Sequence, residues 1–491
     1  MTKSLDTGEL LRDLSQMGSN GRAEAESEEN FPRTLYPVPE HLRAFDPDVT
    51  IVLGPRGAGK TELFRAVMKL KLLPYLKEHA SGIRLRLPSN PSWFPAYPIE
   101  RDFPDAQGLD RFQTERGSRP FSGINFWFAY MLRVLWDELD DSARESMTDL
   151  KRQPGGSAIA IIDAFEKAGD APLLAIDRLD ERLEREDKHI FVGYDELDTL
   201  GAGKWATQSR AIADLIAFWS SYTRRWRRVR AKLFLRTDLF DRHTRAGIAD
   251  LAKLAANRTE ITWSDRNIHG LLLKRIANQS ERLLNYCKSS RIKFRSDDKL
   301  GEIPDMSLVK DAKPLFDRMV GEFMGANRNK GLAYRWVLEH VRDGKGQALP
   351  RPLVRLVEQA ADRQVHSGSL PTPPRLITPA WLRRALDTVS EEHVLSCKDE
   401  WPWLEGLKNV ITGKSVPCGR KELELVFRDY WKTERVQGDA SFVPPTDTPR
   451  EFIDYLVEVG IFRSRTLDRI DAPDLFLAGL GLRRKGGVRK K

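Results

Sequence analysis

The sequence has little cysteine and no long hydrophobic run. Its three cysteines, Cys287, Cys397 and Cys418, lie far apart and do not form a Cys/His set with the spacing of a zinc site. This excludes a disulfide framework and favours a reducing compartment. The most apolar segment, residues 124–136, is interrupted by Arg133 and is much shorter than the roughly 20 residues that a membrane-spanning helix needs.

The N-terminal region also lacks the apolar stretch of a secretory signal and the composition of a transit peptide, because residues 1–30 are polar and acidic. The scattered histidines form no recognisable metal site or nucleophile pair. Together these absences predict a soluble, cytoplasmic protein that has no membrane partner.

The composition is that of a folded protein. Hydrophobic residues make up 41% and charged residues 31% of the 491 residues, so global disorder is excluded. At about 150 residues per domain, this length predicts about three domains. The net charge of +9 permits an anionic partner such as nucleic acid or a nucleotide but does not require one.

Residues 54–61 read Gly-Pro-Arg-Gly-Ala-Gly-Lys-Thr and fit the P-loop pattern G-x-x-x-x-G-K-[ST]. They follow a β-rich run at 49–53 and precede a segment at 61–73 whose apolar residues have helical spacing. A strand, a glycine-rich turn and a helix are the context in which this motif holds phosphate groups. The sequence therefore predicts ATP and Mg²⁺ as cofactors.

Each motif residue has a chemical reason to be there. Gly54, Gly57 and Gly59 let backbone N–H groups turn toward phosphate oxygens at a helix N-terminus. Lys60 is expected to bridge the β- and γ-phosphates, and Thr61 to give its hydroxyl to Mg²⁺.

An acidic cluster follows the next strong strand, His-Ile-Phe-Val-Gly-Tyr-Asp-Glu-Leu-Asp at residues 189–198. Asp195 is the expected Walker B aspartate, which holds the metal, and Glu196 is expected to orient and deprotonate the attacking water. Asp198 competes with Glu196 for that role. Alternatively, Glu196 and Asp198 only cap the following helix, since acidic residues favour helix N-termini.

A further strand at 232–235 ends in Arg236, Thr237 and Asp238. In a P-loop sheet the end of such a strand can place a polar side chain near the γ-phosphate, so Thr237 and Arg236 are candidate nucleotide sensors. The other reading is that they cap a helix that starts near Leu239.

The fold class follows from the order of these elements. Strands that alternate with helices predict an α/β protein with a P-loop parallel sheet covered by helices on both faces, then a helical lid and a winged-helix-like domain. The residues 88–120 read as an irregular, Pro-rich insertion. The strands are expected at 49–53, 83–87, 189–194, 232–235 and 260–263.

The C-terminal domain is predicted from its helix signals. Thr378 as N-cap with Pro379 at N1 begins one helix, and a capping box at 448–451 begins another that ends at Gly460. Residues 461–477 then alternate polar and apolar, as in a β-hairpin. A helix followed by a hairpin suggests a winged-helix module.

These patterns give five predicted segments. They are a flexible N-terminal arm at 1–45, an ATPase core at 46–265 with an insertion near 88–188, a helical lid at 266–365, a linker at 366–379 and a winged-helix-like domain with a basic tail at 380–491.

In these motifs the chain resembles AAA+/STAND-like P-loop ATPases of the type found in bacterial phage-defence loci. The resemblance rests on residues 52–61, 194–198, 234–240, 261–263 and 271–275. It implies that Arg351, in Pro-Arg-Pro at 350–352, matches the sensor 2 arginine that contacts nucleotide from the helical lid.

The same resemblance implies a Mg²⁺-ATP-hydrolysing regulatory ATPase. It further implies a homo-oligomer that acts as a nucleotide-controlled switch in antiphage defence, together with a separate protein effector. Two departures stand out, because the Walker A and Walker B motifs are widely separated and Gly193-Tyr194 interrupts the aliphatic run before the acidic pair.

Several basic segments keep a second function open. Arg242, Arg245 and Arg258 are candidates for an arginine finger given to a neighbouring subunit. The run at 224–230 could bind nucleic acid through phosphate contacts and Trp stacking, or be a solvated helix face, and the basic tail at 483–491 could support DNA binding. The alternative function is an ATP-dependent DNA-binding protein similar to initiator or transposition ATPases, and a third is a scaffold with structural ATP.

Overall fold

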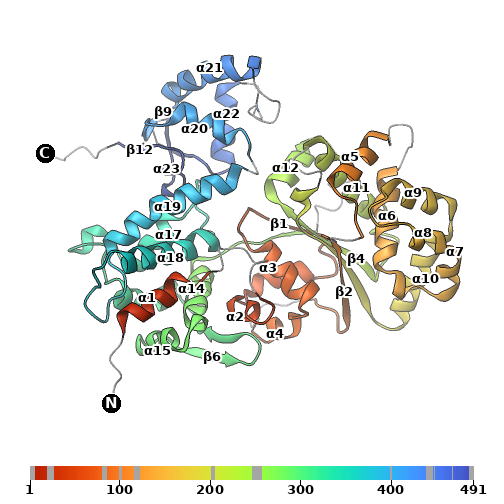
Figure 1. The fold of residues 1–491 in the computed structure, drawn as a ribbon, viewed down its shortest axis with the longest axis horizontal. Coiled ribbons are helices and arrows are strands. Elements are labelled where there is room, and N and C mark those ends of the chain that lie inside the picture. Colours follow the sequence, from red (N-terminus) through yellow and green to blue (C-terminus); the bar gives the residue numbers. More distant parts are fainter. Residues whose placement is uncertain are drawn as a thin grey trace. The chain divides into compact units, whose positions relative to one another are not determined.

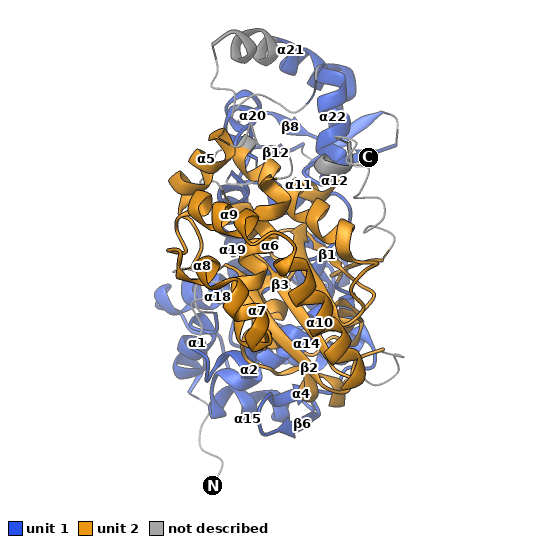
Figure 2. Ribbon diagram, turned by 90° about the vertical axis from the view of Figure 1, so that its right-hand side faces the viewer, with its two compact units in different colours: residues 1–36, 263–491 blue, residues 37–262 orange. Residues whose placement is uncertain are grey.

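The structure is a computed structural model that divides into two compact units, residues 37–262 and residues 1–36 with 263–491 (Figure 2). It describes residues 6–18, 27–79, 86–98, 102–115, 122–200, 205–245, 257–398, 401–437, 446, 448–466 and 468–485, and only the backbone of 205–206, 242–245 and 429–437. Across these described ranges, no helix has the length and apolarity needed to cross a membrane.

A five-stranded parallel sheet forms the centre of the unit 37–262 (Figure 1). Its order is β2-β3-β4-β1-β5, and every neighbouring pair is parallel. The predicted α/β fold is confirmed. The strands are β1 (Ile51–Gly54), β2 (Pro91–Tyr97), β3 (His189–Tyr194), β4 (Val229–Arg236) and β5 (Arg258–Glu260).

Helices cover both faces of this sheet. Successive residues of a strand point to opposite faces, and at the end of β3 they meet different helices. The backbone of Gly193 faces Phe64 and Met68, whereas the ring of Tyr194 contacts Trp127 on the other face. Phe64 ends α3 (Lys60–Phe64), Met68 lies in the π-helical turn η3 (Arg65–Lys69), and Trp127 lies in α6 (Ser122–Val134).

The second strand corrects the sequence reading. It was expected at 83–87, of which 83–85 lie outside the described residues, and the strand beside β3 is instead β2, inside the segment read as irregular. Pro91 and Pro95 lack the N–H groups that a central strand needs. They are tolerated because β2 lies at the edge of the sheet, and the register with β3 shifts between Pro95 and Tyr97.

Most of the insertion is helical. Its aromatic residues Phe103, Phe126 and Trp127 pack together with centroid separations of 5.2–5.7 Å, and α6 is buried as predicted. The remaining helices of this unit are η2 (Pro39–Phe45), α4 (Leu73–Glu78), α5 (Ala106–Glu115), η5 (Trp136–Glu138), α7 (Asp141–Ser146), α8 (Thr148–Arg152), α9 (Ala158–Lys167), α10 (Ala171–Arg185), η6 (Leu197–Thr199), α11 (Trp205–Tyr222) and α12 (Thr237–Arg245).

The unit formed by 1–36 and 263–491 begins with a helix where a flexible arm was expected. Helix α1 (Thr7–Ser15) packs against α18 (Pro350–His366). Its Leu10, Leu11 and Leu14 lie on one face and are buried, and Asp13 forms a 3.0 Å ion pair with Arg282. Burial of this apolar face holds the segment in place, so the prediction of a flexible arm is wrong for these residues.

The segment 366–379, expected to be a linker, joins two helices that pack against each other, α18 and α19 (Pro379–Lys398). Leu376 and Ile377 are buried, and their N–H groups both donate to the Met319 carbonyl oxygen, at 2.8 and 3.0 Å. The segment is thus part of the core of this unit. The start of α19 at Pro379 is as predicted.

Among the described residues, the other elements of this part of the unit are helices and a β-hairpin. They are α2 (Phe31–Thr34), α14 (Asp265–Gln279), α15 (Glu281–Ser289), the antiparallel strands β6 (Phe294–Asp297) and β7 (Gly301–Pro304), η7 (Val309–Ala312), α16 (Lys313–Met319), η8 (Arg328–Lys330) and α17 (Ala333–His340).

The C-terminal part contains a small antiparallel sheet in the order β10-β11-β9. The predicted capping box of Thr448 and Glu451 is present, and Gly460, at φ 86°, follows the helix that it starts. The predicted hairpin after this helix is confirmed. The elements are α20 (Leu404–Ile411), β8 (Ser415–Val416), β9 (Cys418–Gly419), α21 (Arg420–Gln437), α22 (Pro449–Glu458), β10 (Arg463–Arg465), β11 (Arg469–Asp471), α23 (Asp474–Leu477) and β12 (Arg483–Arg484).

A lysine side chain of the central sheet is buried in the core. Lys232 of β4 is fully buried, and its ammonium group donates to the carbonyl oxygens of Asp46 and Val49 and lies 5.0 Å from the centre of the Phe191 ring. Burial lowers the pKa of Lys232 to about 7.

We expect the Lys232→Met variant to reduce the pH dependence of stability. Between pH 7 and 10.5 the unfolded chain protonates this lysine and the folded chain does not, so the free energy of unfolding rises with pH in this window by up to about 1.4 kcal/mol per pH unit. Urea unfolding at several pH values from 7.5 to 9.5, read by hydrogen exchange of β4 peptides, measures the slope. Parallel curves for wild type and variant would contradict this assignment.

Candidate functional site

The predicted P-loop connects β1 to α3. Strand β1 ends at Gly54, helix α3 begins at Lys60, and Gly57 and Gly59 have φ values of 81° and 92°. These positive values favour glycine, because other residues pay a steric penalty there. The strand, turn and helix predicted from the motif are therefore present.

Gly54 and Lys60 lie close together in this turn. A Cβ atom on Gly54 would lie 3.2 Å from the Cβ of Ala58 and 3.5 Å from the Cγ of Lys60. The Lys60 ammonium group donates to the carbonyl oxygens of Gly54 and Pro55 at 2.8 and 3.0 Å. The lysine thus lies along the loop, with its charge directed at backbone carbonyls that an anion could replace.

Asp195 directly follows β3 and is buried beside the loop. Burial raises its pKa to about 6, although a hydrogen bond with the Thr61 side chain and the charge of Lys60 act in the opposite direction. Its Oδ2 atom has no hydrogen-bond partner among the described residues. A buried carboxylate oxygen beside a threonine hydroxyl is a donor set that suits Mg²⁺, which prefers oxygen ligands.

The next acidic residues differ in their surroundings. Glu196 has a φ of 50°, an unfavourable conformation for a non-glycine residue, of a kind that is concentrated at functional sites. Asp198 instead pairs with Arg236 at 3.2 Å, and Arg236 also binds Asp238 at 2.9 Å. The ion pair with Arg236 makes the Asp198 carboxylate less available as a base.

The two predicted sensor residues, Arg236 and Thr237, also differ in their contacts. Arg236 is nearly buried and its guanidinium holds two carboxylates. Thr237 begins α12 directly after β4, and its hydroxyl is buried without a hydrogen-bond partner in the described part of the chain. A buried hydroxyl at the carboxyl end of β4, next to β1, is placed to contact a ligand at the loop.

Sequence reasoning missed the contribution of β2. Tyr97 at its carboxyl end shares a 2.7 Å hydrogen bond with Thr199, and the Gln208 side chain donates to the Asp198 carbonyl. The pKa of Tyr97 is raised, first by burial and then by the charges of Glu196 and Asp198. The Pro-rich sequence gave no signal, because the strand itself was not recognised.

Other predicted residues are not brought to the loop by the described geometry. Arg351 lies in the first turn of α18, in the other unit, so its sensor 2 role stays a prediction. Arg258 pairs in register with Ile51 at the start of β1. It therefore lies at the amino ends of the strands, whereas the P-loop follows the carboxyl end of β1. The side chains of Arg242 and Arg245 lie outside the described residues.

The basic run 224–230 is part of the fold. Arg225 pairs with Asp177 at 2.5 Å, and Trp226 is 1% exposed, stacked on Tyr222 at 4.5 Å between ring centres. A buried tryptophan cannot stack on a nucleic-acid base, so that reading of the run is wrong for Trp226.

Packing explains why Gly193 interrupts the aliphatic run before the acidic pair. A Cβ atom there would lie 2.8 Å from the Met68 Cε and 2.9 Å from the Phe64 ring. Both residues belong to the helical segment that begins at the P-loop. Glycine at this position of β3 lets that segment lie close against the sheet.

Comparison with known proteins gives little further information. No family model matches the chain, and no curated protein matches it. A structure of the ORC2 protein of Aeropyrum pernix as ADPNP-ADP complexes is 12% identical, with 89% of this chain and 90% of that chain covered and a TM-score of 0.30. The ADP form is also 12% identical, with 89% and 86% covered and a TM-score of 0.29.

TM-scores this low carry no argument about this chain. The fold class rests instead on the parallel sheet order, with the P-loop between β1 and α3.

We expect Gly193→Val to destabilise the unit 37–262 by about 1–3 kcal/mol and to weaken nucleotide binding, because the added side chain displaces the helical segment that begins at Lys60. Urea unfolding and calorimetric titration with nucleotide measure the two effects. The control is Gly156→Val in the same unit, where a Cβ atom meets nothing within 4 Å. Equal effects of the two substitutions would refute the packing explanation.

Proposed function

We propose that the chain is a Mg²⁺-dependent ATP-binding and ATP-hydrolysing regulatory protein of the AAA+ type. The observation that carries the proposal is the buried Asp195 Oδ2 atom beside Thr61 and the P-loop, which has no hydrogen-bond partner within the described ranges. An uncompensated buried carboxylate oxygen is costly in the absence of a ligand, and a bound cation would remove that cost.

Binding would use the P-loop residues, with a change in the contacts of Lys60. The N–H groups at the start of α3 and the Lys60 ammonium group would contact phosphate oxygens, the lysine leaving the two carbonyls that it now contacts. Asp195 and Thr61 would hold Mg²⁺, which, when bound, supplies positive charge to the phosphate groups.

Glu196 would orient the attacking water and accept its proton. Its conformation is fixed by the hydrogen bonds that its carbonyl oxygen accepts from the N–H and the hydroxyl of Thr199, at 2.9 and 2.8 Å. Thr237 would donate its hydroxyl to the γ-phosphate region. Arg351 would respond to nucleotide from the helical unit, in line with its sensor 2 position in the sequence.

The regulatory part of the proposal is a switch in which ATP promotes assembly of a homo-oligomer and hydrolysis reverses it. A role in antiphage defence through a separate protein effector rests on the sequence resemblance alone. The alternative, an ATP-dependent DNA-binding protein, gains support from the C-terminal arrangement. There α20, β9, α21, α22 and the β10–β11 hairpin follow each other in the order of a winged helix, with β11 paired to both β10 and β9.

Single substitutions should separate binding from hydrolysis. We expect Lys60→Ala to lose ATP binding, and Glu196→Gln to bind ATP while its turnover falls by at least about 100-fold, because general base catalysis contributes that much. Calorimetry and phosphate release measure the two quantities. Asp198→Asn is the matched control, and a larger loss of turnover there than in Glu196→Gln would transfer the base role to Asp198.

The switch predicts a change of mass. With Mg²⁺-ATP, the wild type should form a defined oligomer in solution, Glu196→Gln should stay assembled for longer, and Lys60→Ala should remain unassembled. Multi-angle light scattering gives the masses. An unchanged mass of the wild type with and without nucleotide would exclude the switch and leave a scaffold with structural ATP.

A further inference from the structure

One face of the β10–β11 hairpin is formed by charged side chains. Arg463 lies opposite Asp471, and Arg465 lies opposite Arg469. Because side chains alternate along a strand, these four residues share one face, while Ile470 points to the other face and is buried in the core. We call the arginines 463, 465, 469 and 484 the arginine face; Arg484 comes from β12, which pairs with β8, and its side chain contacts Asp471.

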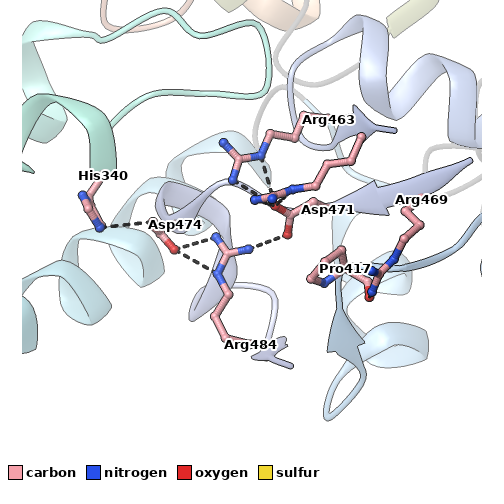
Figure 3. Close-up of polar contacts among 8 residues, drawn as sticks. His340, Pro417, Arg463, Arg469, Asp471, Asp474 and Arg484 are labelled. Atoms are coloured by element: carbon pink, nitrogen blue, oxygen red, sulfur yellow. Dashed lines mark hydrogen bonds and ion pairs between the residues drawn. The ribbon is translucent and has the colours of Figure 1, made fainter. Parts of the chain in front are cut away.

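Asp471 lies at the centre of this face (Figure 3). It is fully buried, yet its carboxylate accepts hydrogen bonds from Arg463 at 2.9 Å, from Arg465 at 2.7 Å and from Arg484. Burial alone would raise its pKa, but the guanidinium groups hold the pKa below its usual value. Asp471 is therefore a charged carboxylate that fixes the positions of three guanidinium groups.

The face carries more positive charge than this ion-pair network needs. A bidentate pair with one arginine already satisfies a carboxylate, whereas Asp471 is bound by three. Three of the four arginines bind two carboxylates, Asp471 and Asp474, so the four positive charges exceed the two negative charges by two. The side chains of Arg463, Arg465 and Arg484 are still 40%, 49% and 33% exposed, so N–H groups remain open to a ligand.

The pairing of Arg465 with Arg469 points in the same direction. Like charges directly opposite each other in an antiparallel pair destabilise the sheet. Arg469 donates to the Pro417 carbonyl oxygen at 2.7 Å, which orients its guanidinium without neutralising it (Figure 3). An anion bound across the two side chains would relieve this repulsion.

We propose that the arginine face binds the phosphate backbone of double-stranded nucleic acid, with Asp471 as a positioning residue that holds the guanidinium groups in a fixed arrangement. The planar fork of arginine matches the geometry of phosphate oxygens. Phosphate contacts account for most of the hydrogen bonds that orient a protein on a duplex, and a two-stranded ribbon is an element that fits the major groove. An acidic protein is the alternative partner, and the experiments below distinguish it from nucleic acid.

This inference does not depend on the proposed ATPase. The arginine face belongs to the unit that contains 263–491, and the P-loop belongs to the other unit. Duplex binding is therefore measured without nucleotide, so that a protein unable to hydrolyse ATP still gives a full answer.

The first experiment compares two arginine substitutions of equal charge. The affinity of the full chain for a fluorescent DNA duplex is measured by anisotropy over a series of salt concentrations. Arg465→Gln should weaken binding by about fivefold at low salt and reduce the slope of log K against log salt by about 1, because one phosphate contact is lost. Arg282→Gln removes a similarly exposed, ion-paired arginine from the same unit, 54% exposed against 49% for Arg465, and should leave both values unchanged.

The second experiment tests the role of Asp471. Asp471→Asn makes the protein more positive, so an unspecific electrostatic attraction predicts tighter binding to DNA. The positioning role predicts weaker binding, because the guanidinium groups lose their common partner and separate. Hydrogen exchange of the β10–β11 peptides checks that the hairpin is still formed, and the Arg465→Gln/Arg469→Gln double variant tests the face if the hairpin does not form.

Three results would overturn the proposal. They are no binding of duplex at low salt, equal affinities of Arg465→Gln and Arg282→Gln, and binding of polyglutamate in place of duplex, which would indicate an acidic protein partner. Duplex RNA and single-stranded DNA in parallel titrations identify the kind of nucleic acid. Tighter binding by Asp471→Asn would contradict the positioning role.

Discussion

The candidate site depends on one constraint, the parallel arrangement of β1, β4 and β3 as neighbours in a single sheet. The carboxyl ends of parallel strands lie at the same end of the sheet. The P-loop after β1, Thr237 after β4 and Asp195 after β3 therefore meet there. These three segments are far apart in the sequence, so only the sheet brings them together. If one of these strands were antiparallel, its carboxyl end would lie at the opposite end of the sheet and the site would not form.

Several residues of the site destabilise the fold, and packing elsewhere in the unit compensates for this. Asp195 is buried with an unpartnered oxygen, Glu196 has a left-handed conformation, and the Thr237 hydroxyl has no partner among the described residues. The aromatic cluster around Trp127 and the close contact of Phe64 with Gly193 provide packing energy nearby. Local cost at a ligand site that is relieved on binding is the pattern expected of a protein controlled by its ligand.

The sequence could predict elements whose signals are local. The P-loop turn, the capping box at Thr448 and the hairpin after Gly460 each follow from residues a few positions apart. Strand β2 escaped prediction because its prolines are acceptable only at a sheet edge, and the sequence does not say which strand is at the edge. Helix α1 escaped because its apolar face is covered by α18, more than 300 residues away in the chain.

The sequence by itself determined the chemistry that this chain carries: a glycine-rich loop with Lys60 and Thr61, an acidic pair after a strand, and an excess of arginine near the C-terminus. The tertiary structure decided which of these groups are paired. Arg236 forms an ion pair with Asp198, and Asp471 is bound by three arginines on one face. The physical reason is that ion pairing and burial depend on distances between residues far apart in sequence, and folding alone sets those distances.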